Sequence, residues 1–180
     1  ETLRIDVQED AWFNATVTVR DVDLEHEGDD HIFTSTDPLV KFVTPWSPRL
    51  SFRPGDTDVG MHEARINVTD GVYTDTVLLR VSVRNVNDPP VAVAGGPAAK
   101  AGEVVEGRPA ELDASGTTDP DLPYGDRLQF LWSSNINGTL GGGQVLTVRS
   151  LVAGIHNITL TVTDSGNLSS SDHFTLDVLK

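Results

Sequence analysis

Apolar residues in this chain recur at every second position over short stretches, and this alternation limits the fold more than any other feature. Residues 77–83 and 157–163 alternate between apolar and polar side chains, and residues 128–132 and 15–19 show the same period. Successive side chains of a β-strand point to opposite faces, so the pattern predicts antiparallel strands with one buried face. Gly, Pro and Asp clusters separate the strands, and no stretch shows the pattern of a three-turn helix. The chain is therefore predicted to be all-β.

The sequence also repeats itself. A Glu is followed twelve or thirteen residues later by Asp-x-Asp, and later by Val-Thr-Asp. The spacing between copies is 97 residues from Glu9 to Glu106, 98 from Asp21 to Asp119 and 94 from Asp70 to Asp164. This period is the size of one immunoglobulin-like sandwich. We predict two tandem immunoglobulin-like Greek-key β-sandwiches, at residues 1–88 and 89–180, because Pro89 and Pro90 end pairing at the boundary.

Composition excludes several classes of function. The 27 acidic and 13 basic residues give a net charge of −14, which disfavours nucleic acids and anionic membranes as partners. There is no Cys, so disulfides, thiolate metal sites and Cys catalysis are excluded. No apolar stretch is long enough to cross a membrane. The chain opens on Glu1, and we expect it to be a piece of a longer surface protein.

Five of the eight Asn residues stand in Asn-x-Ser/Thr sequons: Asn14, Asn67, Asn137, Asn157 and Asn167. This excess predicts a glycosylated protein at the cell surface or outside the cell. The first three alternate with apolar residues on their strands and should face solvent, whereas the last two fall in predicted turns. The alternative is that Thr-rich strands inflate the number of sequons.

Two family resemblances follow from short motifs in order. Residues 50–54 (LSFRP), 58–60 (DVG), 66–71 (INVTDG) and 85–90 (NVNDPP) resemble a cadherin-like module of the dystroglycan type. Residues 112–115 (LDAS), 119–121 (DPD), 131–134 (LWSS) and 158–164 (ITLTVTD) resemble a polycystic-kidney-disease-type (PKD) domain. The resemblance implies Greek-key sandwiches in arrays on cell surfaces or secreted enzymes. It implies adhesion, spacing or presentation, and no catalysis.

The acidic residues predict calcium sites. Ca²⁺ takes six to eight oxygen ligands from several loops, and the first and third residues of an extended Asp-x-Asp point the same way. Because the Asp-x-Asp and Val-Thr-Asp loops can meet at one end of a Greek-key sandwich, we expect one acidic cluster in each module. The cluster at the tip of the first module comprises Asp21, Asp23 and Asp70, and that of the second comprises Asp119, Asp121 and Asp164.

The resemblance to cadherins implies that Ca²⁺ rigidifies the interdomain junction. The ligands implied are Glu9, Asp56 and Asp58 from the first module, Asn85, Asn87 and Asp88 from the linker, and Asp119, Asp121, Asp126 and Asp164 from the second module. The alternative is that these acids cap turns by accepting backbone N–H bonds.

Motifs for catalysis are absent from the sequence. His62-Glu63 lacks a second His four residues later, and residues 21–32 end in Ile32 where a calcium-binding EF-hand loop needs an acid. Residues 25–31 (EHEGDDH) could hold a transition metal, although such a run is more often a solvated loop. Residues 138–143 (GTLGGG) are interpreted as a hairpin turn. We therefore expect no enzymatic activity.

The aromatic residues leave a second function open. Trp132 is in phase with the apolar residues of its strand and should lie in the core, whereas Trp46 stands between prolines and could be exposed. The function predicted is that of structural or adhesion modules of a larger surface protein. Their expected partners are neighbouring modules of the same chain, and surface proteins or glycans. The alternative is a carbohydrate-binding or spacer region of a secreted enzyme, which would need a planar cluster of exposed aromatic rings.

Overall fold

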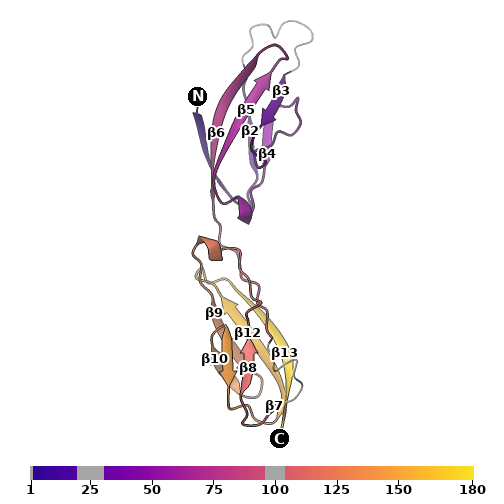
Figure 1. Cartoon of the computed structure of the whole chain (residues 1–180), viewed down its shortest axis with the longest axis vertical. Coiled ribbons are helices and arrows are strands. Elements are labelled where there is room, and N and C mark those ends of the chain that lie inside the picture. Colours follow the sequence, from indigo (N-terminus) through magenta and orange to yellow (C-terminus); the bar gives the residue numbers. More distant parts are fainter. Residues whose placement is uncertain (1, 20–30, 96–103) are drawn as a thin grey trace. The chain divides into compact units, whose positions relative to one another are not determined.

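The structure is a computed structural model that describes residues 2–19, 31–95 and 104–180. Contacts between residues divide the chain into two compact units, Glu1–Val86 (unit 1) and Asn87–Lys180 (unit 2). This division falls two residues before the predicted boundary. Each unit is built almost entirely of strands (Figure 1).

Unit 1 consists of a four-stranded and a two-stranded sheet. The larger sheet has the order β1-β6-β5-β3, and the smaller sheet pairs β2 with β4. The bounds are β1 Thr2–Gln8, β2 Phe13–Thr16, β3 Ile32–Ser35, β4 Arg49–Phe52, β5 Gly60–Thr69 and β6 Thr74–Arg84, with a 3₁₀ helix, η1, at Asp56–Asp58. β1 runs parallel to β6, and the other pairs are antiparallel. The first strand therefore closes the sheet beside the last.

The core of unit 1 lies between these sheets. Leu79, Val81 and Val83 of β6 are buried, as the alternation predicted. They pack in one cluster with Leu50 and Phe52 from the smaller sheet. Burying one such side chain contributes about 1.5–3 kcal/mol, so the two faces hold the sheets together.

The strand expected over residues 15–19 is shorter than predicted. β2 ends at Thr16, opposite Arg49, although the N–H of Val17 still donates to the carbonyl of Pro48 at 2.8 Å. Pro48 has no N–H to return a hydrogen bond, so the ladder cannot continue past this pair.

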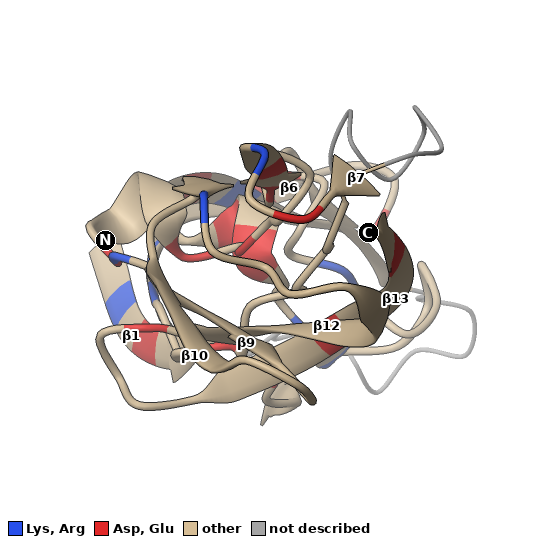
Figure 2. Cartoon of the chain, turned by 90° about the horizontal axis from the view of Figure 1, so that it is seen from below, with Lys and Arg blue, Asp and Glu red and all other residues tan. Residues whose placement is uncertain are grey.

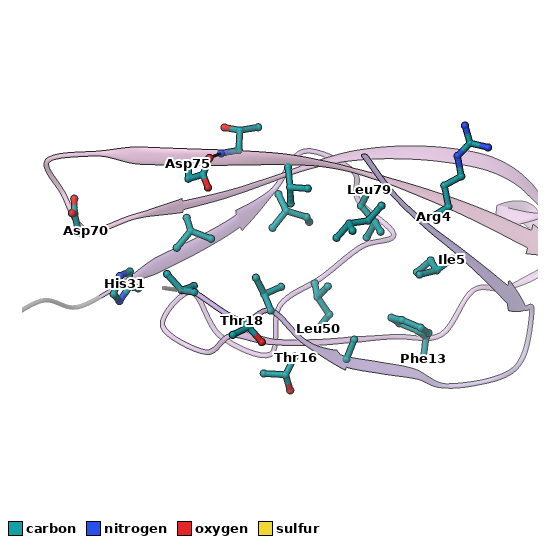
Figure 3. A pocket seen from close by; sticks show the side chains of 18 of the residues that line it. Arg4, Ile5, Phe13, Thr16, Thr18, His31, Leu50, Asp70, Asp75 and Leu79 are labelled. Atoms are coloured by element: carbon teal, nitrogen blue, oxygen red, sulfur yellow. Dashed lines mark hydrogen bonds between the residues drawn. The ribbon is translucent and has the colours of Figure 1, made fainter. Parts of the chain in front are cut away.

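An open, mostly apolar cavity of about 640 Å³ lies in unit 1. Ile5, Phe13, Leu50 and Leu79 are among the residues that line it (Figure 3). Asp70 also lines it, and Figure 3 shows this residue at the end that is remote from Phe13.

Unit 2 also consists of two sheets, and its larger sheet has one strand more than that of unit 1. The five-stranded sheet has the order β10-β9-β12-β13-β7, and a second sheet pairs β11 with β8. The bounds are β7 Val104–Val105, β8 Ala110–Asp113, β9 Gln129–Ser134, β10 Gly138–Gly142, β11 Val145–Val148, β12 Gly154–Thr163 and β13 Ser169–Leu179, with a 3₁₀ helix, η2, at Leu122–Tyr124. β13 again runs parallel to the first strand of its sheet, β7.

Trp132 is central to the core of unit 2. It is fully buried, as predicted, and packs in one cluster with Leu112, Ile158 and Leu160. Its indole N–H donates to the carbonyl of Gly143 at 3.0 Å, so burial leaves no unpaired polar group on the ring.

The interpretation of residues 138–143 as a hairpin turn is wrong. Residues 138–142 form the edge strand β10, with an irregularity between Thr139 and Gly141, and the turn lies at residues 135–137. Glycine has no side chain to display a period of two, so the sequence gives no strand signal here. Gly142 also allows close packing, because a Cβ would lie 2.9 Å from the carbonyl oxygen of Phe130.

The predicted fold class is confirmed: the chain is all-β and forms two tandem immunoglobulin-like sandwiches. The two helices of the described residues are single 3₁₀ turns, and no helix in that part of the chain is long and apolar enough to span a bilayer.

Candidate metal centre

Three loops of unit 2 bring three carboxylates together. Asp119 lies between β8 and η2, Asp126 between η2 and β9, and Asp164 directly after β12. Each offers a carboxylate oxygen, and these oxygens all lie within 4.8 Å of one another. Asp119 and Asp164 are buried and Asp126 is half-buried. We call these three residues, together with the buried Asp121, the unit 2 acidic cluster.

The acids of the cluster also hold turns. Oδ1 of Asp119 accepts the N–H of Asp121 at 2.8 Å, and Oδ1 of Asp164 accepts the N–H of Leu168 at 2.8 Å. Oδ1 of Asp126 accepts the N–H of Ser165 at 2.9 Å and also the hydroxyl of Ser165. One oxygen of Asp119 and one of Asp164 therefore cap turns, as the alternative expects, whereas the oxygen of Asp126 is held by Ser165 of another loop.

Two of the remaining oxygens are left for another ligand. Oδ2 of Asp119 and Oδ2 of Asp126 are buried and accept no hydrogen bond from the described part of the chain. Burial and the charges of Asp126, Asp121 and Asp164 raise the pKa of Asp119 above its ordinary value, although its bond from the N–H of Asp121 opposes this shift. Hydrogen bonds from Ser165 lower the pKa of Asp126. Crowded carboxylates with unpaired oxygens cost free energy unless a proton or a cation neutralises them.

The first residues of unit 2 bind directly to this cluster. The amide Nδ2 of Asn87 donates to Oδ2 of Asp164 at 2.9 Å, and the N–H of Asp88 donates to Oδ2 of Asp121 at 2.6 Å. Gly166 leaves room for this bond, because a Cβ at this position would lie 2.6–2.9 Å from the side-chain amide of Asn87 and would displace it. The start of unit 2 is thus fixed to the same acids that form the cluster.

The predicted ligands of unit 1 are spread over several segments. Glu9 is only 2 % exposed, and its Oε1 accepts the N–H of Val86 at 2.5 Å. Oδ2 of Asp58 accepts the N–H of Gly55 at 3.0 Å, so this acid caps η1. Asp56 is half-buried, and Asn85 is exposed.

Sequence reasoning missed Asp10. One of its carboxylate oxygens lies within 4.8 Å of one of Asp56, and Oδ1 of Asp10 pairs with the guanidinium of Arg53 at 2.9 Å. The position next to Glu9 was the only signal in the sequence. Asp10 also has a φ of 58°, a conformation that sequence patterns do not display.

The tip site predicted for the first module is only partly described. Asp21 and Asp23 lie outside the described residues, as do residues 25–30 of the acidic run. Oδ1 of Asp70 accepts the N–H groups of Tyr73 and Val72, both at 2.7 Å, and these bonds lower its pKa. Asp70 is therefore the cap of the β5–β6 turn, where Gly71 adopts a φ of 95°.

The sequons lie on the outer surfaces of both units. Asn14, Asn157 and Asn167 are exposed, whereas Asn67 and Asn137 are half-buried. Asn67 bonds to the hydroxyls of Thr34 and Thr76 on neighbouring strands. As predicted, none of the first three sequon residues is buried, and Asn137 and Asn167 lie in turns.

Two tryptophans are exposed on the surface of unit 1. Trp12 is 68 % exposed and Trp46 is 67 % exposed, so the expectation for Trp46 is correct. Among the described residues, the aromatic contacts join Phe13 to Phe52, His31 to Phe33 and Phe33 to Phe42, and none includes a tryptophan.

No protein-family model matches the chain, and no curated protein matches it. Solved structures do match. Extracellular cadherin domains 1–5 of protocadherin gamma B2 give a TM-score of 0.57 at 16% identity, covering 99% of this chain and 38% of that one. PcdhgB3 EC1–4 gives 0.60 at 16% identity, with coverages of 99% and 48%.

Human protocadherin-24 EC1–2 gives a TM-score of 0.52 at 15% identity and covers 98% of this chain and 94% of that one. The chain thus spans less than half the length of the two larger fragments. At these identities the likeness shows the fold alone. In fold, the chain is a tandem of cadherin-like, immunoglobulin-like β-sandwiches.

Proposed function

We propose that the chain is a pair of extracellular adhesion-type modules of a larger surface protein, and that the unit 2 acidic cluster binds Ca²⁺. The first module is proposed as cadherin-like of the dystroglycan type, and the second as PKD-like. The observation that carries the calcium proposal is the buried carboxylate of Asp119, which lies beside those of Asp126 and Asp164 and whose Oδ2 accepts no hydrogen bond from the described residues.

The donor set fits a hard cation. Every candidate ligand of the cluster is an oxygen, and Ca²⁺ binds six to eight oxygens at 2.3–2.6 Å. Asp119, Asp126 and Asp164 supply carboxylates on three loops, and Asp121 supplies a fourth beside them. A bound Ca²⁺ would neutralise their charge. The chain's own residues position these oxygens, because each acid is held by a backbone N–H through its other oxygen or through the linker.

The same acids connect the cation to the linker. Asn87 and Asp88 bond to Asp164 and Asp121 within unit 2, and the preceding residue, Val86, bonds to Glu9 within unit 1. Because these linker residues are consecutive, ordering the cluster restricts the backbone between the modules. We propose that Ca²⁺ stiffens the junction in this way, with Glu9, Asp56 and Asp58 of the first module and Asn85 of the linker as further ligands.

Calcium binding is tested by isothermal titration calorimetry on the full chain. We expect a site with a dissociation constant on the order of 0.1–1 mM, as for extracellular modules. Asp164→Asn should abolish this binding, whereas Glu111→Gln, which removes an exposed acid of β8, should leave it unchanged. Equal loss of binding in both variants would show that the signal is nonspecific attraction to a chain of charge −14.

Stiffening of the junction is tested by small-angle scattering of the full chain with calcium and with chelator. We expect a single, narrower distribution of interatomic distances with calcium. If the scattering is unchanged while calorimetry shows binding, the cluster is a calcium site without a mechanical role.

A further inference from the structure

The outer face of the five-stranded sheet of unit 2 carries almost no charge. β9 and β12 contain no Asp, Glu, Lys or Arg. The register places Leu131, Thr161 and Ser171 in one row across β9, β12 and β13, and Ser133, Thr159 and His173 in the next. Among the outward side chains of these three strands, Asp177 is the one Asp, Glu, Lys or Arg residue.

Unit 1 provides an internal comparison. Both units contain a long antiparallel hairpin whose last strand runs parallel to the first strand of the sheet. In unit 1 this sheet is crossed by ion pairs: Arg80 contacts Glu63 at 2.7 Å and Arg84 contacts Asp6 at 3.4 Å. Figure 2 shows blue and red bands on β1, whereas β12 is tan. A sheet of this kind can therefore carry charged residues, so the fold itself does not account for the uncharged face of unit 2.

We propose that this outer face of β9, β12 and β13 is a contact surface for a second copy of the chain. Charged residues are depleted at the centre of protein interfaces. Each copy carries a net charge of −14, so most pairs of faces repel each other, and an uncharged face offers the least repulsive approach. Leu131 and Ile155, which are 49 % and 66 % exposed, add apolar area to it.

The chemistry of the face is self-complementary. A hydroxyl both donates and accepts, so two identical Ser and Thr surfaces can bond to each other across a two-fold axis. Thr161 and Ser171 already bond to each other within one sheet at 3.1 Å. A flat polysaccharide would need aromatic platforms, and the aromatic rings of these strands, Phe130, Trp132 and Phe174, alternate with the outward residues and pack on the core.

The area of the face sets the strength of the contact. The ten residues of β12 span about 33 Å and β13 runs beside it along this whole length, whereas the six residues of β9 span only about 20 Å, so the three strands with their side chains cover roughly 400 Å² per copy. This is the size of a weak, transient contact and is below that of a stable interface, so the dissociation constant should be on the order of 0.1–1 mM. Such weak contacts become effective when many copies stand on one surface.

The test is sedimentation equilibrium of the full chain, produced without glycans because Asn157 stands on this face, and in chelator so that calcium cannot bridge copies. We expect dimers that strengthen as salt rises, since salt screens the repulsion of like-charged copies. Thr161→Glu should weaken dimerisation at least 10-fold. The matched Thr147→Glu, on the other sheet of unit 2, adds the same charge at an exposed strand position and should weaken it less than 2-fold.

A mixture of Thr161→Glu and Thr161→Lys chains should associate more strongly than either variant alone, because the charges added to the two faces then have opposite signs. Circular dichroism checks that each variant is folded. A monomer at about 1 mM, or equal weakening by both Glu variants, would overturn the proposal. If the monomeric chain were retained on a glycan column and Thr161→Glu abolished this retention, the face would be a glycan-binding surface. That result would equally overturn the proposal.

Discussion

Replacing Asp119 by Asn should stabilise unit 2 in chelator and destroy its response to calcium. The amide oxygen of Asn can still accept the N–H of Asp121, as Oδ1 of Asp119 does at 2.8 Å. The amide NH₂ would take the place of Oδ2 and could donate to Oδ2 of Asp126, which is buried and accepts no hydrogen bond from the described residues. A repulsive contact thus becomes an attractive one.

The magnitude follows from the spacing of the carboxylates. Two unit charges 4.8 Å apart repel by about 3.5 kcal/mol at an effective dielectric constant of about 20, and Asp119 and Asp164 approach within that distance. Relaxation and partial protonation reduce this, so we expect Asp119→Asn to raise the free energy of unfolding in chelator by about 1–2 kcal/mol. Calcium at ten times its dissociation constant should add about 1.4 kcal/mol to the native protein and nothing to the variant.

The pH dependence of the stability of unit 2 follows from the direction in which the pKa of Asp119 is shifted. Because the pKa of Asp119 is raised in the folded state, folded unit 2 binds this proton more tightly than the unfolded chain does. In chelator, the contribution of Asp119 to stability therefore grows as pH falls through this raised pKa toward the ordinary value of 3.8, and it disappears above the raised pKa. Asp119→Asn should remove this component of the pH profile.

The assay is tryptophan fluorescence during thermal unfolding. Trp132 is fully buried in unit 2, whereas Trp12 and Trp46 of unit 1 are already exposed, so the emission shift reports mainly on unit 2. A change of 1 kcal/mol corresponds to about 4–8 °C in Tm for a domain of this size. Glu111→Gln is the control. A variant that melts below the native protein in chelator would show that Asp119 is not destabilised by its neighbouring acids, and one that still gains stability with calcium would show that Asp119 is not a ligand.

Three further predictions concern the linker, the β10 edge and the sequons. Asp121→Ala and Asp88→Ala should each remove most of the rise in Tm that calcium causes, because both acids are expected ligands. Circular dichroism in chelator should show both modules folded in each variant. A full rise in Tm in either variant would exclude that acid as a ligand. Gly142→Ala should lower the free energy of unfolding of unit 2 by about 1–3 kcal/mol in urea titrations, since its Cβ would lie 2.9 Å from a backbone oxygen, and an unchanged midpoint would contradict this close approach. Mass spectrometry of the protein from its own host should find sugar on at least one sequon, and five bare Asn residues would argue against the glycoprotein interpretation.

The sequence predicts the strands well where burial decides the side-chain pattern. β6, β9 and β12 appear where the period of two is strict, because each of these strands has one face on a core. It fails at residues 138–142, where glycine shows no pattern, and at the end of β2, where the missing N–H of Pro48 stops the ladder. Both failures depend on a partner strand that is distant in the sequence.

The candidate site is predictable in outline for unit 2. The loop holding Asp119 and the end of β12 at Asp164 meet because both lie at the same end of the sandwich. What sequence cannot show is which oxygen of each acid is used by a turn. Asp70 has the same Val-Thr-Asp context as Asp164, yet Gly71 directs it into a tight turn in which Oδ1 accepts two backbone N–H groups.

Calcium binding by the unit 2 acidic cluster is tested most directly by a crystal structure of the full chain grown with calcium, with anomalous diffraction data. We expect an anomalous peak in unit 2 at 2.3–2.6 Å from carboxylate oxygens of Asp119, Asp126 and Asp164, with Asn87 and Asp88 ordered beside it. A cluster without such a peak at 10 mM calcium, with the same turn-capping bonds and a water or a proton between the acids, would contradict this expectation.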